Sequence, residues 1–194
     1  WKIYVFLLRN FQGIYIGNNV VDSITLVNVN GLPPGISLSC NSSNCSYEGD
    51  TVGCVDIFGT TNSIGQHPVS FDINGWIHID SISSAKIMAK AGFDSITIDL
   101  QHGMFSFEKC RDIIQVIEKY EVFPIVRVPS NDIGIINKVL DAGAYGVICP
   151  LINNKTDVEK FTDACFYPPK GNRSFGPTLV HIDKDNYFNK SNSE

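Results

Sequence analysis

Hydrophobic and polar positions follow two different patterns along this chain. Residues 1 to about 72 alternate short β-rich runs such as VVDSITLVNV with turn-forming stretches such as NGLPPG and NSSN, and they show no helical periodicity. From Asn74 onward, short apolar runs alternate with segments whose apolar residues recur every three or four positions. The first pattern predicts antiparallel strands joined by tight turns, and the second predicts βαβ units on a parallel sheet.

The second part contains four predicted strand–helix units. Its apolar runs predict strands at residues 75–79, 94–100, 123–128 and 145–151. Its amphipathic segments predict helices at residues 83–93, 107–121, 132–143 and 157–166. A closed (β/α)₈ barrel takes about 250 residues, so four units make half of one. We therefore expect an α/β fold, with the first half of a (β/α)₈ TIM barrel over residues 73–194 and a β-rich segment over residues 1–72 before it.

The helices carry signals for their buried faces and their ends. The second helix is expected to bury four residues at helical spacing, which are Cys110, Ile113, Ile114 and Ile117. The first helix is expected to bury Ile87, Met88 and Ala91. Gly92 and Gly143 predict the ends of the first and third helices. Ser106 is expected to cap the start of the second helix, and Thr156 with Glu159 to form a capping box before the fourth.

Polar side chains follow the predicted strands at their carboxyl ends, which is where a barrel of this kind places its active site. Asp99, Gln101 and His102 end the second strand, and Arg127 ends the third. A histidine there can take up and return protons at neutral pH, although it could also be a turn histidine bonded to the backbone. Arg127 suits a carboxylate or an enolate oxygen, and the alternative is an internal ion pair with Asp99.

Other polar residues have both a functional and a structural interpretation. Asp141 ends a helix, where the dipole disfavours an anion by about 0.3–1 kcal/mol, so a compensating partner is expected. It should lie at the opposite end of the strands from His102 and could assist it only across a subunit interface. Lys170 and Arg173, in YPPKGNRSFGP, could bind phosphate or carboxylate, or lie in a solvated turn. Trp76 could line the pocket or belong to the core.

Composition and charge favour a protein whose partners are small molecules. The chain is 43% hydrophobic and 18% charged, with a net charge of -5 and no basic cluster, so nucleic acid is not an expected partner. The opening run WKIYVFLL is far shorter than the roughly 20 residues of a membrane span, so no membrane partner is expected. The start at Trp1 and the end in NKSNSE predict a fragment of a longer protein.

The six cysteines divide between the two parts. Cys40, Cys45 and Cys54 could form a disulfide plus one free thiol, or an incomplete zinc site with His67 as the fourth ligand. The later three, which are Cys110, Cys149 and Cys165, are expected to be buried thiols of a cytosolic protein.

The first part resembles the Ig-like repeats of secreted bacterial proteins, through GLPPGISLSC and GCVDIFGTTNSIGQHPVSF. The resemblance implies an extracellular module, whereas the second part is expected to be cytoplasmic. A misjoined gene fragment, with its seam near residues 70–74, and a true two-domain protein are both open interpretations.

The second part resembles the HpcH/HpaI aldolase/citrate lyase family, through GWIHIDSISSAKIMAKAGFDSITIDLQHG, VRVPSNDIGIINKVLDAGAYGVICPLIN and FYPPKGNRSFGP. The resemblance implies a (β/α)₈ barrel that uses a divalent metal (Mg²⁺, Mn²⁺ or Co²⁺) to cleave or form 4-hydroxy-2-oxo acids. The products are pyruvate, or a related 2-oxo acid, and an aldehyde. It also implies that His102 is the acid/base residue, that Arg127 stabilises the transition state, and that Asp141 raises the basicity of the histidine. Gln101 stands where the family usually has Glu.

The same resemblance places the metal ligands beyond residue 194, so the chain alone is expected to show no aldolase activity. It also implies a homo-oligomer when the protein is full length. The alternatives are a citryl- or malyl-CoA-type lyase on the same fold, or a secreted Ig-like binding module without catalysis.

Overall fold

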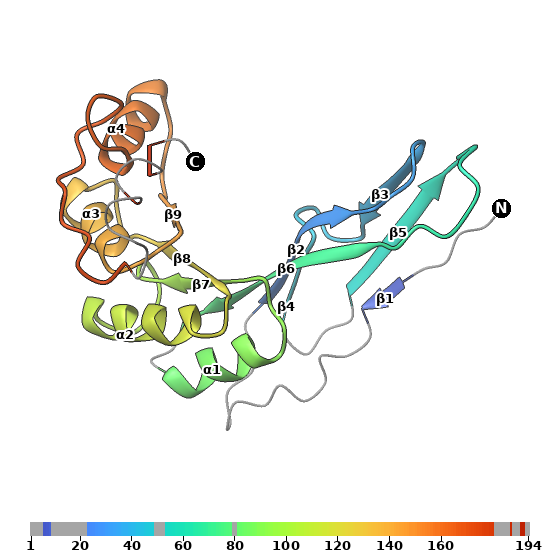
Figure 1. The fold of residues 1–194 in the computed structure, drawn as a ribbon, viewed down its shortest axis with the longest axis horizontal. Coiled ribbons are helices and arrows are strands. Elements are labelled where there is room, and N and C mark those ends of the chain that lie inside the picture. Colours follow the sequence, from blue (N-terminus) through green and yellow to red (C-terminus); the bar gives the residue numbers. More distant parts are fainter. Residues whose placement is uncertain are drawn as a thin grey trace.

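The fold comes from a computed structural model, which describes residues 6–8, 23–48, 53–78, 81–180, 187 and 191–192. Its centre is a six-stranded mixed sheet with the strand order β4-β2-β6-β7-β8-β9 (Figure 1). Four of these strands are parallel, and they are β6 (Ser70–Ile77), β7 (Ser95–Asp99), β8 (Phe123–Arg127) and β9 (Gly146–Ile148). The predicted run of parallel strands alternating with helices is confirmed.

Four described helices follow the parallel strands in turn, as expected of βα units. They are α1 (Ile82–Lys90), α2 (Phe107–Glu118), α3 (Ile133–Asp141) and α4 (Lys155–Cys165). Ile96 and Ile98 of β7 and Val126 of β8 are fully buried in one core with the helices. Because successive side chains of a strand point to opposite faces, Ser95, Thr97 and Asp99 project from the other face of β7. The alternation therefore separates the helix-covered core from a face that carries polar groups.

Most of the helix signals are confirmed. The four residues predicted to face the core from α2 are fully buried, and they are Cys110, Ile113, Ile114 and Ile117. Gly92 and Gly143, with φ of 89° and 103°, take the left-handed conformation that ends α1 and α3. Ser106 is the N-cap residue of α2, although its side chain caps no backbone N–H.

Two local expectations are wrong. Ile87 is 38% exposed, and Ala91, the C-cap residue of α1, is exposed as well. The helix is turned so that its buried face consists of Ser84, Ala85, Met88 and Ala89. The fourth helix is capped by Asn154, whose side chain accepts a hydrogen bond from the backbone N–H of Asp157, and not by a box of Thr156 and Glu159. The helix consequently begins two residues earlier than predicted.

The β-rich part is joined to the parallel sheet through β6. Three of its strands form a separate antiparallel sheet, and they are β1 (Phe6–Leu8), β3 (Ile36–Cys40) and β5 (Gly53–Gly59). The other two, β2 (Ser23–Asn30) and β4 (Ser46–Glu48), extend the six-stranded sheet. β2 runs antiparallel along β6 from the pair Ile24–Gly75 to the pair Asn30–Ser70.

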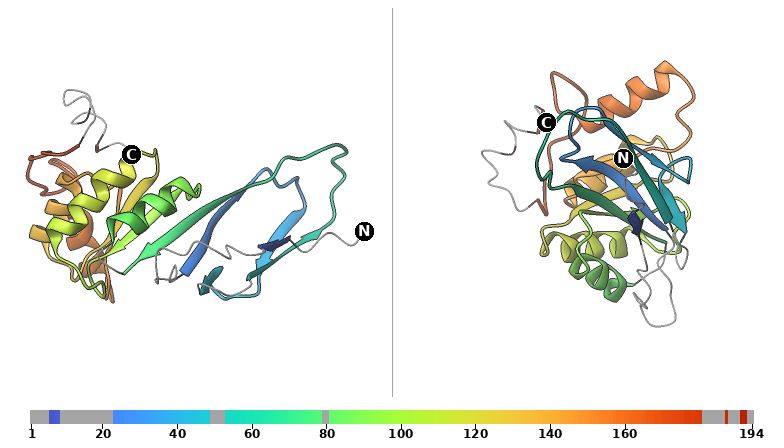
Figure 2. Two further views of the ribbon diagram at one scale, coloured as in Figure 1. Left: turned by 90° about the horizontal axis from the view of Figure 1, so that it is seen from below. Right: turned by 90° about the vertical axis from the view of Figure 1, so that its right-hand side faces the viewer.

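β6 therefore crosses the expected seam without a break. It begins at Ser70, five residues before the strand predicted at 75–79, and Figure 2 shows it running between the two parts of the molecule. Residue 79 lies outside the described residues. β6 is longer than predicted because β2 supplies backbone partners for its first half, while β7 pairs with its second half.

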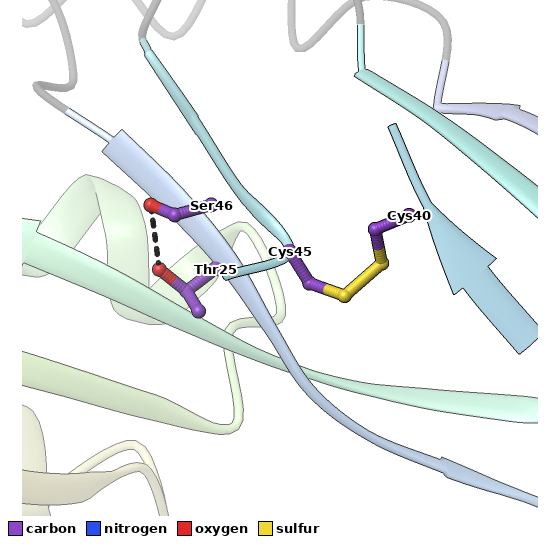
Figure 3. Close-up of a disulfide and its surroundings, with 4 residues drawn as sticks. All are labelled: Thr25, Cys40, Cys45 and Ser46. Carbon is purple, nitrogen blue, oxygen red and sulfur yellow. Dashed lines mark hydrogen bonds between the residues drawn. A yellow bond between two sulfur atoms is a disulfide. The ribbon is translucent and has the colours of Figure 1, made fainter. Parts of the chain in front are cut away.

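A disulfide joins Cys40, at the end of β3, to Cys45 (Figure 3). Next to it, Thr25 Oγ1 donates a hydrogen bond of 3.0 Å to Ser46 Oγ. The zinc alternative is wrong, because two sulfurs that are bonded to each other are not the thiolates that zinc requires. The side chain of Cys54 lies outside the described part of the chain, so the free thiol expected there stays a prediction.

The remaining three cysteines are free, with Cys110 buried and Cys149 and Cys165 half-buried. Within the described ranges, no helix has the length and apolar character needed to cross a membrane.

Candidate functional site

The site lies at the carboxyl ends of β6, β7 and β8, which the parallel register brings together. Asp99, the last residue of β7, is paired with Arg127, the last residue of β8. On the other side of β7, Ile77 is paired with Ile98, so His78 follows β6 next to Asp99. We call the cluster of Trp76, His78, Asp99 and Arg127, with the turn 100–104, the rim.

Asp99 is the centre of the rim, and its side chain is fully buried. Oδ1 accepts hydrogen bonds from Arg127 Nε at 2.9 Å and from the backbone N–H groups of Gln101 and His102 at 2.9 and 3.1 Å. Oδ2 accepts from Arg127 Nη2 and from Trp76 Nε1 at 3.3 Å, and His78 Nε2 lies 2.8 Å from it. The internal ion pair, which was the structural alternative for Arg127, is therefore the arrangement present.

These donors keep Asp99 ionised. Burial alone would raise the pKa of the carboxyl group, but the hydrogen bonds from Arg127, His102, Trp76 and Gln101 outweigh it. Together they hold the pKa of Asp99 well below its usual range. Asp99 is consequently an anion and an obligate hydrogen-bond acceptor at neutral pH.

Arg127 keeps part of its binding capacity. Asp99 engages Nε–H and one N–H of Nη2, and no hydrogen bond from the other guanidinium N–H groups to a described residue is present. The guanidinium lies 5.0 Å from the centroid of the Trp76 ring, and its side chain is 22% exposed. Trp76 thus lies at the rim rather than within the helix-covered core. The group is oriented by Asp99 and Trp76 while remaining accessible.

Gln101 and His102 lie in a turn that is tied to three strands. Gly103 N–H donates to Asp99 O at 3.0 Å, Leu100 N–H to Arg127 O at 2.8 Å, and Met104 N–H to His78 O at 3.0 Å. A Cβ atom on Gly103 would lie 1.9 Å from Asp99 O, so the turn requires glycine there. The His102 side chain is exposed, and Gln101 is half-buried. The turn presents the imidazole at the rim on a fixed backbone.

Asp141 belongs to the opposite end of the sheet. It is the last residue of α3, and the chain then enters β9 at its amino end, whereas His102 follows the carboxyl end of β7. The compensating partner is Arg173, whose Nη2 donates to Asp141 Oδ1 at 2.8 Å. Burial raises the pKa of Asp141, although the bond from Arg173 acts in the other direction.

Arg173 is not an external anion site. Its side chain is only 4% exposed, it pairs with Asp141, and its guanidinium lies 4.5 Å from the centroid of the Tyr167 ring. Lys170 Nζ donates to the backbone carbonyl of Asn192. The phosphate or carboxylate interpretation of this stretch is therefore wrong for Arg173, whose acidic partner is a residue of this chain.

His78 is the rim residue that the sequence did not single out. The available signal was its position two residues after Trp76, which places both on one face of the strand. The spacing alone does not place His78 beside Asp99, because that also requires the register of β6 against β7.

The described residues do not form a metal site by themselves. No three His, Cys, Asp or Glu side chains of the described part come together in a way that could hold a metal ion. Asp99, the buried carboxylate of the rim, has both of its oxygens engaged by protein donors.

The second part of the chain is similar to known proteins. The sequence model of the HpcH/HpaI aldolase/citrate lyase family matches residues 74–192. A hydroxypyruvate/pyruvate aldolase of Rhizorhabdus wittichii is 37% identical over 103 residues, which is 53% of this chain and 41% of the relative. A 4-hydroxy-2-oxo-heptane-1,7-dioate aldolase of Escherichia coli is 31% identical over 123 residues, covering 61% of this chain and 47% of the relative.

The fold is similar as well. The structure of a family protein from Burkholderia cenocepacia, described as an HpcH/HpaI aldolase/citrate lyase, matches with a TM-score of 0.57 and 25% identity. The match covers 62% of this chain and 50% of that one. The chain thus spans about half the length of the relatives it matches.

Proposed function

Because the chain belongs to the HpcH/HpaI aldolase/citrate lyase family, we propose that it forms part of a metal-dependent aldolase. The reaction is the cleavage or formation of a 4-hydroxy-2-oxo acid, with pyruvate or a related 2-oxo acid and an aldehyde on the other side. The observation that supports the proposal is the rim, where parallel strand ends bring an oriented guanidinium and the turn that carries an exposed imidazole to one edge of the sheet.

Arg127 and His102 divide the chemistry in this proposal. Arg127 binds a carboxylate or enolate oxygen of the 2-oxo acid through the N–H groups that Asp99 leaves unused. His102 accepts the proton of the C4 hydroxyl as the C3–C4 bond breaks, and it returns a proton to the enolate carbon. The bonding electrons go to the enolate oxygen, so atoms and charge balance. Gln101 contributes to substrate binding from the same turn.

The metal and the second subunit belong to the proposal for the whole protein. The divalent ion would be Mg²⁺, Mn²⁺ or Co²⁺, and no step above depends on where it lies. Asp141 would assist His102 only if another subunit of a homo-oligomer brought it there, because the two residues lie at opposite ends of one sheet. An obligate monomer would contradict that role.

A graft tests the proposed activity. Residues 74–180 replace the matching segment of the E. coli aldolase, and pyruvate release from 4-hydroxy-2-oxo acids is measured with added divalent metal. We expect turnover, and we expect His102→Asn in the graft to lower kcat by about 10²- to 10⁴-fold. A folded graft without turnover would contradict the function. Turnover by the 194-residue chain alone would refute the expectation that it is inactive.

The same graft distinguishes the proposed aldolase from the alternative, a citryl- or malyl-CoA-type lyase. Cleavage of citryl-CoA or malyl-CoA in preference to 4-hydroxy-2-oxo acids would assign the chain to the CoA-type lyases on the same fold.

One observation favours the alternative of a secreted module for the first part. The Cys40–Cys45 disulfide is typical of an oxidising compartment, whereas free thiols such as Cys110 fit the cytoplasm proposed for the aldolase part. Reading the genomic DNA across residues 70–74 tests whether the two parts belong to one gene. An in-frame junction would mean that both parts belong to one protein. A break in the reading frame would mean that the first part does not belong to the aldolase.

A further inference from the structure

His78 occupies the rim between solvent and the buried carboxylate. It follows β6 directly and lies beside Asp99, because Ile77 is paired with Ile98. Its ring stacks on Trp76 with the centroids 6.2 Å apart. The side chain of His78 is 33% exposed, whereas that of Asp99 is not exposed at all.

The contact with Asp99 fixes the tautomer of the imidazole. Nε2 of His78 lies 2.8 Å from Oδ2 of Asp99. A carboxylate that already accepts bonds from a guanidinium and from two backbone N–H groups is ionised, and it can only accept. The ring nitrogen that faces it must therefore carry hydrogen. Neutral His78 is the Nε2–H tautomer, and the protonated form makes the same bond.

His78 and Arg127 hold one carboxylate from opposite sides. β6, which leads into His78, and β8, which ends in Arg127, are the two neighbours of β7. Oδ2 accepts from both residues, and the bond from Trp76 is longer, at 3.3 Å. The torsion that sets the plane of an aspartate carboxylate is soft, so the plane depends on the donors around it. Without His78, only the longer bond from Trp76 would hold the carboxylate from the side of β6, and the guanidinium bound in the same plane would be held less firmly.

We propose that His78 is a positioning residue of the rim. By donating from Nε2 to Asp99, it holds the carboxylate in the plane that Arg127 binds, and it thereby keeps the unused N–H groups of Arg127 in one direction. The positioning of Arg127 by His78 is independent of the proposed function. Only the use of Arg127 to bind an oxygen of the substrate rests on that function. Donors fixed in advance stabilise a developing charge without reorganising.

The tautomer is the first test, and it uses the unmodified 194-residue chain. Long-range ¹H–¹⁵N spectra at about pH 9, above the ordinary histidine pKa, distinguish the two neutral forms. We expect His78 to carry its proton on Nε2. A proton on Nδ1 would overturn the proposal, whether or not any variant folds.

Two substitutions provide the second test. His78→Gln keeps an N–H donor of similar reach, while His78→Phe keeps a ring and removes the donor. We expect solvent exchange of the Arg127 Nε–H to rise about tenfold in the Phe variant, as the loss of one hydrogen bond to a charged group implies, and to change little in the Gln variant.

The backbone N–H of Ile98, in the core of β7, is the internal control. A general loss of stability would accelerate its exchange together with that of Arg127, and this result would overturn the positioning role. Unchanged exchange at Arg127 in the Phe variant would also overturn it. Neither measurement uses aldolase activity, so a failure of the proposed function would be recognised separately in the graft.

Discussion

Among single residues, one buried anion holds the rim together. Asp99 joins three strands because it accepts from Arg127, from His78 and from two backbone N–H groups. Removing the charge would leave a guanidinium that is 22% exposed without its partner. Such a loss differs from that of a surface ion pair, because water cannot fully replace the missing contact.

Asp99→Asn should therefore lower the free energy of unfolding by about 3–5 kcal/mol. Its matched control is Asp112→Asn, since Asp112 pairs with Arg111 and both side chains are 42% exposed. The control should change the free energy by less than about 1 kcal/mol. Urea unfolding of both variants measures the difference, and equal losses would show that Asp99 is not the buried anchor described here.

The pH dependence of Asp99 follows from the direction of its shift. Its pKa is lower in the folded than in the unfolded chain, so its charge stabilises the fold above about pH 4, the unfolded value. That stability is lost as the pH falls from there toward the folded pKa. The ¹³C carboxyl resonance of Asp99 should still be that of a carboxylate at pH 3. A midpoint near 4 would contradict the hydrogen-bonded geometry.

At the scale of elements, local patterns predicted what local interactions decide. The face of α2 and the glycine ends of α1 and α3 were predictable, because spacing and backbone conformation alone determine them. The start of β6 was not, because it depends on pairing with β2, about 45 residues away in the sequence. The start of α4 was missed because Asn154 and Thr156 can both cap a helix. In the structure Asn154 is the cap, and its side chain accepts from the backbone N–H of Asp157.

The rim was predictable in part for the same reason. Strand ends identified Gln101, His102 and Arg127 as neighbours, since parallel strands end at one edge. The pairing of Arg127 with Asp99 was foreseen as an alternative, and only the register decided for it. His78 needed that register too, and Arg173 needed the fold of the loop that carries it to Asp141.

The turn after β7 gives a prediction at this scale. Gly103→Ala places a Cβ atom 1.9 Å from Asp99 O, so the turn must shift, at a cost of about 1–3 kcal/mol in unfolding free energy. Gly146→Ala is the control, because its Cβ would meet Ile125 at an ordinary 3.6 Å. Thermal unfolding compares the two. If Gly103→Ala is as stable as Gly146→Ala, the close approach of the turn to the carbonyl oxygen of Asp99 is contradicted.

At the scale of the whole molecule, the two parts share a strand. β6 pairs with β2 on one edge and with β7 on the other, so part of the edge that a closed barrel would use is already covered. The shared strand couples the parts, even though the sequence patterns on its two sides differ.

Proline substitutions in β2 test this coupling. Thr25 is paired with Asn74 and with Ser46, so Thr25→Pro should remove backbone bonds and separate β2 from β6. Val27 lies at the register irregularity and is 61% exposed, so Val27→Pro serves as the control. Hydrogen exchange at residues 70–75 should rise at least about tenfold more in the first variant. Equal exchange would mean that β2 does not pair with β6 in solution.

In the proposed function the rim orients Arg127 for aldol chemistry, and kcat/KM for pyruvate release by the graft carrying Arg127→Lys tests this orientation. Lysine keeps the charge but loses the two-pronged bond to Asp99, so we expect a fall of about 10²- to 10³-fold. Arg111→Lys, at an exposed ion pair away from the rim, should leave kcat/KM unchanged. An Arg127→Lys graft as active as its parent would contradict the account.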